Sequence, residues 1–301
     1  MKKGIAGVLG FIAFVVLWGL IEPYILDVET EAATVPNLPE DWEGQRIGQI
    51  SDFQLGMWMH NISTARRSVE YLVEENPAAV VISGDFIYKS LPNAETEINK
   101  VIDTLQPLVE ANIPTYAVLG NHDYSHKPPN EALGQQVKTA LEENGIRVLQ
   151  NEAIALESPQ AASSQAEAEQ PLYLVGIGSL IAENDQAAQA LSQLDTSSPR
   201  IVLMHNPGSF GQLPAESAPL AMAGHTHGGQ IRLPYTPHWS WLSLVKNEEV
   251  YGDGWIEDYG APGNQLYVNR GIGFSDVPVR LNCRPEVTLF TLNSSTAVSE
   301  R

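Results

Sequence analysis

Five short apolar runs in this chain each end at residues that can bind a metal ion. Four of the runs are residues 47–50, 79–82, 116–119 and 201–204, and the fifth motif reads Gly224-His225-Thr226-His227-Gly228-Gly229. In open α/β sheets, ligands gather at the carboxyl ends of the strands. We therefore expect one shared site, built from Asp52, Asp85, Asn121, His205, His225 and His227.

Two carboxylates, one amide and three imidazoles suit a pair of divalent cations. Ligands of these types without a thiolate favour Mn, Fe, Zn or Co over a copper or iron-sulfur site. Two such cations about 3.5 to 4 Å apart can hold a hydroxide, lower its pKa and neutralise the oxygens of a phosphorus centre during in-line attack. The expected chemistry is hydrolysis of a phosphate ester by metal-activated hydroxide.

Each motif taken alone also has an ordinary structural explanation. An aspartate after a strand, such as Asp52 or Asp85, is common in turns. The two histidines His225 and His227 are the strongest single signal, because histidine is the commonest protein metal ligand, although a polar turn uses similar residues. The occurrence of all the motifs together favours the metal site.

The charge of the chain excludes one large class of partner. Among 301 residues, 36 are acidic and 17 basic, which gives a formal net charge of -19. Nucleic acids need clustered Lys and Arg, so we expect no nucleic-acid partner. A phosphate substrate must be held locally, and bound cations can reverse the sign of the field in a small pocket. The single cysteine, Cys283, neither requires nor excludes an oxidising compartment.

The segments around these residues alternate strand with helix. Apolar residues recur at helical spacing in residues 64–75 and 95–110. Helices between apolar strands imply a mixed or parallel sheet that is covered on its faces. After Gly228, short aromatic and β-branched stretches lie among many Gly and Pro residues, and we expect them to complete a second sheet.

The N-terminus predicts a membrane anchor. Two lysines precede an uncharged stretch, residues 4–21, that is rich in Val, Leu, Ile and Phe. This length just spans a hydrocarbon core; the apolar part of a cleaved signal peptide, the alternative, is shorter and lies close to a small-x-small site. We expect residues 1–22 to form one transmembrane helix and residues 23–45 to form an extended acidic tether that contains prolines.

The orientation of the anchor follows from its flanking charges. Lys2 and Lys3 precede the span, so the positive-inside tendency keeps the N-terminus in the cytoplasm. We expect a single-pass protein of the cytoplasmic membrane with an extracytoplasmic catalytic domain. The sequence leaves the oligomeric state open.

The ordered motif series resembles the calcineurin-like metallophosphoesterases. The motifs are Asp52-Phe53-Gln54, Gly84-Asp85, Gly120-Asn121-His122-Asp123, His205-Asn206 and Gly224-His225-Thr226-His227. The apolar N-terminus and the segments Gly228-Gly229-Gln230, Arg270-Gly271-Ile272-Gly273 and Pro278-Val279-Arg280 are similar to the membrane-associated bacterial branch. The resemblance implies an α/β (α+β) fold, a four-layer αββα sandwich of two mixed β-sheets with flanking helices. The metallophosphoesterase domain would cover residues 46–293, and residues 294–301 would form a C-terminal tail.

The resemblance also implies a role for each residue of the site. By the family pattern, seven ligands divide between two metals: Asp52, Gln54 and His227 at the first, Asp85 as the bridge, and Asn121, His205 and His225 at the second. His122 has no metal role in the family. It would be the general acid that protonates the leaving oxygen.

Two positions depart from the family pattern. Gln54 stands where the family usually shows histidine, so the first metal would gain a harder, neutral oxygen ligand. Tyr88 stands where a Gly-Asp-x-x-Asp pattern would supply a carboxylate that orients His122. A tyrosine can hydrogen-bond an imidazole, but it carries no charge to stabilise the imidazolium.

Several other residues are candidates for supporting roles. Asp123 adjoins His122 and is a candidate for supporting the site. Arg232, Arg270 and Arg280 are candidates for gripping a distal phosphate, although paired or solvated arginines are the default. The aromatic run at residues 238–245 would either contact lipid or an acyl substrate, or form an ordinary buried element.

The sequence thus predicts a membrane-anchored, dinuclear-metal phosphohydrolase. Its substrate would be a phosphomonoester or phosphodiester, and the anchor makes a lipid-linked or envelope-linked phosphate plausible. The alternative is a catalytically weak metal-binding module at the membrane that binds a phosphorylated ligand or protein partner. Gln54 and Tyr88 are the features that favour the alternative.

Overall fold

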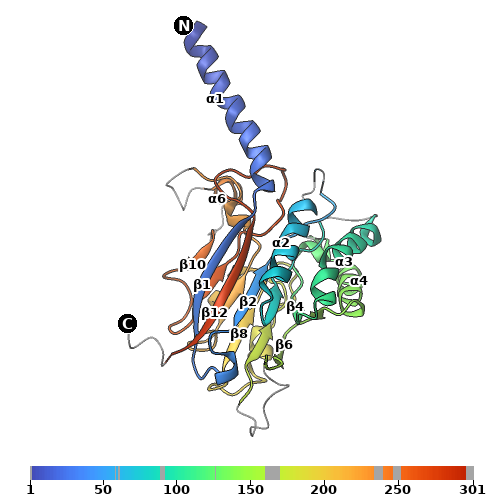
Figure 1. The fold of residues 1–301 in the computed structure, drawn as a ribbon, viewed down its shortest axis with the longest axis vertical. Helices are drawn as coiled ribbons and strands as arrows, with labels where there is room; N and C mark the ends of the chain where they lie inside the picture. Colours follow the sequence, from blue (N-terminus) through green and yellow to red (C-terminus); the bar gives the residue numbers. More distant parts are fainter. Residues whose placement is uncertain are drawn as a thin grey trace.

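Two six-stranded sheets pack face to face in the computed structural model, with helices on the outer faces (Figure 1). The structure describes residues 2–57, 59, 62–88, 92–125, 127–159, 170–233, 240–246 and 252–295. Strand order is β1-β12-β2-β3-β4-β5 in the first sheet and β10-β11-β9-β8-β7-β6 in the second. Both sheets contain parallel and antiparallel pairs. The predicted four-layer sandwich of two mixed sheets is confirmed.

The bounds of the elements are as follows. The first sheet contains β1 (Asp27–Val35), β2 (Arg46–Ile50), β3 (Ala79–Ile82), β4 (Thr115–Ala117), β5 (Arg147–Val148) and β12 (Glu286–Ser294). The second contains β6 (Glu152–Ala155), β7 (Tyr173–Gly176), β8 (Arg200–Leu203), β9 (Ala221–Ala223), β10 (Gly254–Ile256) and β11 (Leu266–Val268). The α-helices are α1 (Lys2–Ile21), α2 (Ile62–Glu75), α3 (Ala94–Glu110), α4 (Glu131–Glu143), α5 (Ala187–Leu191) and α6 (Trp241–Lys246).

The four residues of β3 show why the apolar runs form strands. Val80 and Ile82 pack toward the helices, and Ala79 and Val81 pack toward the second sheet. A strand that is covered on both faces reads as a continuous apolar run. Because β2, β3 and β4 run parallel to one another, their carboxyl ends lie at one end of the sandwich.

The helices on the first sheet agree with the sequence pattern. Helices were expected over residues 64–75 and 95–110, and α2 and α3 occupy residues 62–75 and 94–110. The apolar stripes of both helices lie in one buried cluster with the outer face of the first sheet. These helices therefore cover the sheet that carries Asp52 and Asp85.

The last strand corrects one expectation about the second sheet. β10 and β11 complete that sheet, but β12 lies between β1 and β2 in the first sheet. Val287 and Leu289 face the helices, whereas Phe290 and Leu292 face the second sheet. Apolar residues on both faces suit an interior position in a covered sheet, and this pattern explains where β12 inserts.

The prediction of a solvated tether over residues 23–45 is wrong. β1 occupies residues 27–35 and pairs in parallel with β12 along its whole length. Ala33 and Val35 are buried, and the Trp42 side chain is only 1% exposed in the cluster between the sheets. The folded domain thus begins at the end of α1 and not near Arg46.

Tertiary partners explain why such an acidic segment forms a strand. Asp27 and Glu29 each accept a hydrogen bond from the Arg270 guanidinium, at 3.1 and 2.8 Å. Glu31 accepts from the indole Nε1 of Trp255 at 2.9 Å. The carboxylates of β1 are paired with groups that lie far along the chain, so composition alone misrepresents the segment.

We expect Trp42 to contribute strongly to stability. Truncation of a large buried aromatic residue to alanine leaves a cavity, so Trp42→Ala should lower the free energy of unfolding by about 3–5 kcal/mol. The matched control is Trp241→Ala, at a residue that is 42% exposed, which should change it by less than about 0.5 kcal/mol. Denaturation of the full chain in detergent, followed by near-UV circular dichroism, measures both. Equal effects of the two substitutions would contradict the placement of Trp42.

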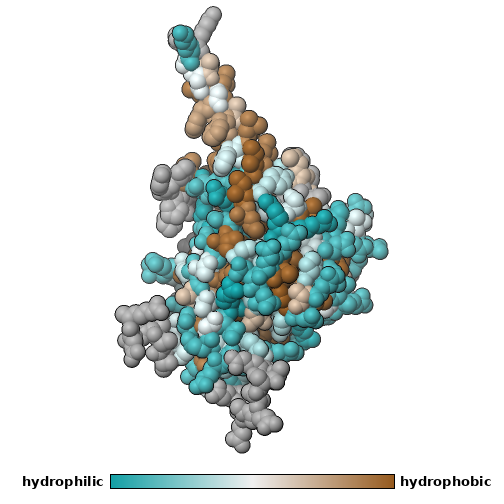
Figure 2. All heavy atoms as spheres, in the orientation of Figure 1, coloured by the Kyte–Doolittle hydropathy of each residue, from teal (hydrophilic) through white to brown (hydrophobic). Residues whose placement is uncertain are grey.

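Helix α1 has the length and surface of a membrane span. Residues 3–24 are long and apolar enough to cross a membrane, by length and composition. Phe11 and Phe14 are 67% and 62% exposed, and the helix stands clear of the domain with an apolar surface (Figures 1 and 2). The predicted N-terminal apolar helix is confirmed, and its length fits a bilayer core.

The last turn of α1 is fixed to the domain. The carbonyl of Gly19 accepts from the backbone N–H of Arg280 at 3.0 Å, and Glu22 accepts from the Trp18 indole at 2.8 Å. Glu22 also accepts from the backbone N–H of Cys283 at 2.5 Å. A Cβ at Gly19 would lie 2.7 Å from the Val279 side chain, so this close approach favours glycine. No flexible linker separates α1 from the domain.

Candidate metal centre

The predicted ligands converge where the carboxyl ends of the two sheets meet. β2, β3 and β4 lead into Asp52, Asp85 and Asn121, and β8 and β9 lead into His205 and the two histidines His225 and His227. Between the sheets, Gln49 Nε2 donates to Ala223 O at 2.9 Å and to Ser83 Oγ at 2.7 Å. Side chains from strands of both sheets therefore share one site.

One half of the site surrounds His205. Its Nε2 lies 3.3 Å from Asp85 Oδ2, 3.2 Å from Asn121 Oδ1 and 3.2 Å from His225 Nδ1. Ligand atoms of Asp85, His205 and His225 all lie within 4.8 Å of one another. Two imidazoles, an amide oxygen and a carboxylate at these separations can surround one divalent cation.

The other half surrounds His227. Gln54 Nε2 lies 3.0 Å from His227 Nε2 and 3.0 Å from Asp85 Oδ2. Asp52 Oδ1 lies 3.6 Å from His227 Nε2. Asp85 Oδ2 therefore contacts both halves, which is the position that a bridging carboxylate requires.

Buried polar atoms support the fit of cations to this site. Asp52 Oδ1 and Gln54 Oε1 are buried and have no hydrogen-bond partner among the described residues. A buried oxygen without a partner costs free energy unless a ligand satisfies it. The donor set and these two atoms fit a metal pair, and rotation of the Gln54 side chain would bring its amide oxygen to the position that its Nε2 occupies.

The tautomer of His205 is set by the backbone. Its Nδ1 lies 2.6 Å from the carbonyl oxygen of Ser83, so Nδ1–H donates there. In the neutral ring this leaves the Nε2 lone pair directed at Asp85 and Asn121. A hydrogen bond from the distal nitrogen commonly orients a metal-binding histidine.

Five of the seven candidate ligands have a left-handed backbone. The φ angles are 53° at Asp52, 48° at Gln54, 58° at Asp85, 73° at His225 and 49° at His227. Non-glycine residues rarely adopt this region, and such strain persists only when surrounding structure enforces it. The sharp turns after β2, β3 and β9 aim these side chains into the shared site.

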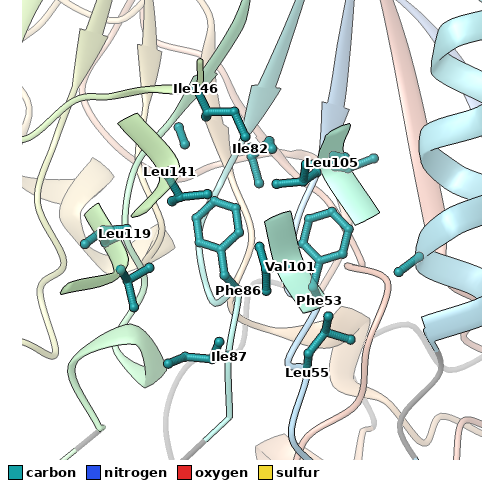
Figure 3. Packing of buried hydrophobic residues seen from close by; sticks show 14 of the residues in the cluster. Phe53, Leu55, Ile82, Phe86, Ile87, Val101, Leu105, Leu119, Leu141 and Ile146 are labelled. Atoms are coloured by element: carbon teal, nitrogen blue, oxygen red, sulfur yellow. The ribbon is translucent and has the colours of Figure 1, made fainter. Parts of the chain in front are cut away.

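Two aromatic side chains supply part of that enforcement. Phe53 lies between Asp52 and Gln54, and Phe86 follows Asp85. The two rings stack with centroids 6.1 Å apart and an interplanar angle of 9°, within the core beneath the helices (Figure 3). Burial of alternate residues anchors both loops while the polar neighbours face the site.

Close approach of loops explains two glycines of the motifs. A Cβ at Gly120 would lie 2.1 Å from Asp85 Oδ1, and one at Gly224 would lie 2.0 Å from Ser51 Oγ. Side chains at either position would displace the ligand loops. The glycines of these motifs are thus required by packing of the site itself.

Asp123 supports the site without belonging to the ligand cluster. Its carboxylate accepts from the backbone N–H groups of Asp85, Phe86, Ile87 and Gly120. These bonds tie the loop after β3 to the loop after β4. Burial and the nearby Asp85 charge raise the pKa of Asp123 to about 7, against the effect of the backbone donors.

His122 lies against the ligand cluster, and Tyr88 packs on it. The backbone N–H of His122 donates to Asp85 Oδ1 at 2.8 Å. The Tyr88 ring stacks on the imidazole with centroids 4.7 Å apart, and its hydroxyl donates to Asp276 at 3.2 Å. Tyr88 thus orients the imidazole through ring packing, where the sequence suggested a hydrogen bond.

Electrostatics of the site are dominated by buried carboxylates. Burial raises the pKa of Asp52 to about 6, although His205 opposes the rise. Burial also disfavours the charged form of Asp85, but His205 and His122 outweigh it and hold the Asp85 pKa well below its ordinary value. Burial lowers the pKa of His205, yet the Asp85 and Asp52 carboxylates outweigh burial and raise it to about 9. The concentrated negative charge suits cations.

Two of the candidate arginines are neutralised away from the ligand cluster. Arg232 and Arg270 both pair with Asp253. Arg270 also pairs with Asp27, Glu29 and Glu286. Arg270 thus joins β1 to the domain. Both arginines are paired with carboxylates, which is the default that their residue type suggests, and a contact with a distal phosphate stays a prediction.

Arg280 is a support for a ligand loop rather than a substrate residue. It is fully buried, and its guanidinium donates to the carbonyl oxygens of Arg270, Gly271 and Gly273. Its Nη2 lies 3.4 Å from His227 Nδ1. The same residue binds Gly19 through its backbone, so it links α1 to the site.

Some contributors were not visible in the sequence. Ser83 acts through its backbone carbonyl on His205, and Gln49 acts as a clamp between the sheets. Any residue can supply a backbone acceptor, so the sequence could not indicate the role of Ser83. A polar residue within an apolar strand is unusual, so Gln49 could have been recognised as a candidate for a buried contact. Of the aromatic run, His238 and Trp239 lie outside the described residues, as do residues 296–301 of the predicted tail.

Comparison with known proteins identifies the family. A model of the calcineurin-like phosphoesterases matches residues 45–229, more than half of the chain. The chain belongs to the calcineurin-like phosphoesterases. The predicted family and the predicted activity class, a metal-dependent phosphoesterase, are confirmed.

Several proteins resemble this phosphoesterase along most of its length. Phosphodiesterase YaeI of Escherichia coli strain K12 is 33% identical over 221 residues, which are 73% of this chain and 72% of that protein. The uncharacterized metallophosphoesterase YkuE of Bacillus subtilis strain 168 is 27% identical over 91% of this chain and 88% of that protein. A transmembrane protein with metallophosphoesterase domain from Danio rerio is 27% identical over 94% of this chain and 61% of that protein. A crystal structure of a dimetal phosphatase from Danio rerio, at 13% identity and a TM-score of 0.41, covers 76% of this chain and 88% of that chain.

Proposed function

We propose that this calcineurin-like phosphoesterase is a membrane-anchored hydrolase of phosphomonoesters or phosphodiesters with a dinuclear metal centre. The observation that carries the proposal is the shared position of Asp85 between two ligand groups. Asp52, Gln54 and His227 would hold one cation, and Asn121, His205 and His225 would hold the other. The similarity to a phosphodiesterase of Escherichia coli supports the same chemistry.

The metals and the protein side chains would have different roles in hydrolysis. Two bound divalent cations would supply an activated water and neutralise the charge of the phosphoryl oxygens. Asp85 holds the two ligand groups in register through its contacts with His205 and Gln54. His122, beside this carboxylate and packed on Tyr88, would donate a proton to the leaving oxygen.

Metal removal gives a direct test of the enzyme against the rival binding module. We expect the full chain in detergent to lose turnover of para-nitrophenyl phosphate or its bis-ester after treatment with EDTA. Turnover should return when Mn²⁺, Zn²⁺, Co²⁺ or Fe²⁺ is added, and the order of these metals identifies the preferred pair. The ratio of the two reporters distinguishes a monoesterase from a diesterase. Metal binding by calorimetry without any turnover would favour the binding module instead.

The membrane placement is part of the proposal. The exposed apolar surface of α1 and its length support a single span, as does the similarity to a transmembrane protein with a metallophosphoesterase domain. Lys2 and Lys3 favour a cytoplasmic N-terminus and an extracytoplasmic catalytic domain. Alkaline phosphatase fused after Arg301 should be active, whereas a green fluorescent protein fusion there should be dark; the reverse pattern would overturn this orientation.

The proximity of α1 to the metal centre favours a lipid-linked or envelope-linked substrate. Gly19 contacts Arg280 through the backbone, and the Arg280 side chain contacts His227. One residue thus connects the membrane helix with the ligand cluster. A phosphate ester carried at the membrane surface would need little displacement to reach this site.

A further inference from the structure

A cavity of about 680 Å³ lies between α1 and the catalytic domain. Its volume falls within the range of about 300–1,000 Å³ that is typical of ligand pockets. One wall is apolar and consists of Phe11, Val15 and Trp18 from α1. The charged lining consists of the arginines Arg232, Arg270 and Arg284 and the carboxylates Glu22 and Asp27. Both carboxylates are engaged, Glu22 by the Cys283 N–H and Asp27 by Arg270.

The apolar wall is a single face of the helix. Phe11, Val15 and Trp18 follow the i, i+4, i+7 spacing that places side chains on one stripe. Val15 is half-buried, while its neighbours Val16 and Leu17 are 53% and 60% exposed on another face. The cavity therefore has an apolar wall on a membrane-spanning helix, in which Val15 and Trp18 are half-buried against the domain and Phe11 is exposed.

The polar side of the cavity offers one available cation. Arg232 and Arg270 are already paired with Asp253. Arg284 is exposed, and its side chain makes no hydrogen bond or ion pair with the other described residues. In a chain of net charge -19, an unpaired cation beside an apolar wall suits an anionic group with a hydrocarbon tail.

Exposed apolar residues of the domain lie near the C-terminal end of α1. Leu233, Trp241 and Leu244 are 53%, 42% and 61% exposed. Figure 1 shows α6, which carries Trp241 and Leu244, close to the end of α1 where the helix enters the domain. Tryptophan is enriched at membrane–water interfaces, so this end of the domain suits contact with lipid headgroups.

The cavity is separate from the metal centre. Cys283, which lines the cavity, places its Sγ 3.1 Å from His227 O and 3.4 Å from Gly228 O. It thus contacts the backbone of the ligand loop, whereas the His227 imidazole faces Gln54 on the ligand side. A molecule in the cavity would not occupy the substrate position.

We propose that this cavity binds one membrane phospholipid, with an acyl chain against Phe11, Val15 and Trp18 and its phosphate at Arg284. A hydrocarbon chain fits the apolar wall, and the phosphate pairs with the Arg284 guanidinium, which lines the cavity together with Trp18 near the end of α1. The inference rests on the membrane placement of α1 and is independent of phosphate-ester hydrolysis.

A larger side chain on the cavity face of α1 tests whether an acyl chain lies there. The full chain is reconstituted in nanodiscs of phosphatidylglycerol and phosphatidylcholine. Native mass spectrometry of the protein released from these nanodiscs then counts the lipids that stay bound. We expect one retained phosphatidylglycerol per chain, and loss of at least half of that occupancy in Val15→Trp. Val16→Trp adds the same bulk on an exposed face and should retain the lipid. Equal occupancy in both variants, or a chain dimer without lipid, would overturn the proposal.

Charge reversal tests the phosphate position. Arg284→Glu should lower phosphatidylglycerol retention several-fold, whereas Arg66→Glu, at an exposed arginine of α2 outside the cavity, should not. Diacylglycerol, which has the same chains without the phosphate, should compete poorly with phosphatidylglycerol for the unaltered protein. Equal competition, or equal effects of the two substitutions, would refute a phosphate contact at Arg284. Turnover of para-nitrophenyl phosphate by Val15→Trp, measured in parallel, reports on hydrolysis separately.

Discussion

Asp85→Asn should remove almost all turnover while leaving the fold intact. Asp85 Oδ2 contacts both His205 and Gln54, so its carboxylate is the group that both metal positions would share. Loss of its charge weakens both positions at once. Because bound metals supply several kcal/mol of transition-state stabilisation, we expect kcat/KM to fall about 10³-fold. Asparagine has nearly the same shape and can still accept from the His122 N–H, so the melting temperature should change little.

The metal content decides how Asp85→Asn acts. Elemental analysis of the purified variant should show less bound metal than the unaltered chain. Asp103→Asn, on the exposed face of α3, provides the matched control and should leave metal content and turnover unchanged. Full metal content together with full turnover in Asp85→Asn would rule out the bridging role.

His122→Ala should lower kcat by about 10²–10⁴-fold, the usual contribution of a positioned general acid. The residue lies beside Asp85 and is held by the Tyr88 ring, and its side chain is not one of the seven candidate ligands. We therefore expect the metal content of this variant to equal that of the unaltered protein. Steady-state kinetics with saturating metal measures the change.

A comparison of leaving groups distinguishes proton donation from a structural role of His122. Phenolate needs protonation more than para-nitrophenolate, so the loss in His122→Ala should be larger for phenyl phosphate than for para-nitrophenyl phosphate. Tyr88→Phe keeps the stacked ring and should preserve the leaving-group dependence of the unaltered protein. The same factor of loss on both substrates would show that His122 only shapes the site.

The site was largely predictable because its residues follow strands. An apolar run that ends at Asp52 or Asp85 encodes both a buried strand and the polar side chain at its end. In a parallel arrangement, the ends of such strands must meet. The order of the motifs therefore indicated which side chains converge before any contact was known.

The contacts that individual side chains make were less predictable. Arg232 and Arg270 were candidates for a phosphate, but carboxylates from distant segments neutralise them. For Tyr88 the sequence allowed a hydrogen bond to an imidazole, and the structure shows that its ring stacks on His122. Each of these outcomes depends on which neighbour folding brings within a few ångströms, and sequence spacing carries no such information.

By itself, the sequence determined a covered sheet and the polar residues that meet at its end, because these follow from local runs of apolar residues and from the residue types after them. The family and the two-sheet sandwich followed from the resemblance of the ordered motifs to the calcineurin-like phosphoesterases. Only the tertiary structure decided that residues 27–35 form a strand, since their stability comes from pairing with β12 and from Arg270 and Trp255. It also decided that α1 joins the domain without a linker, through Gly19 and Arg280. Contacts between residues far apart in the chain have no local signature, and here they connect the apolar helix through Arg280 to His227.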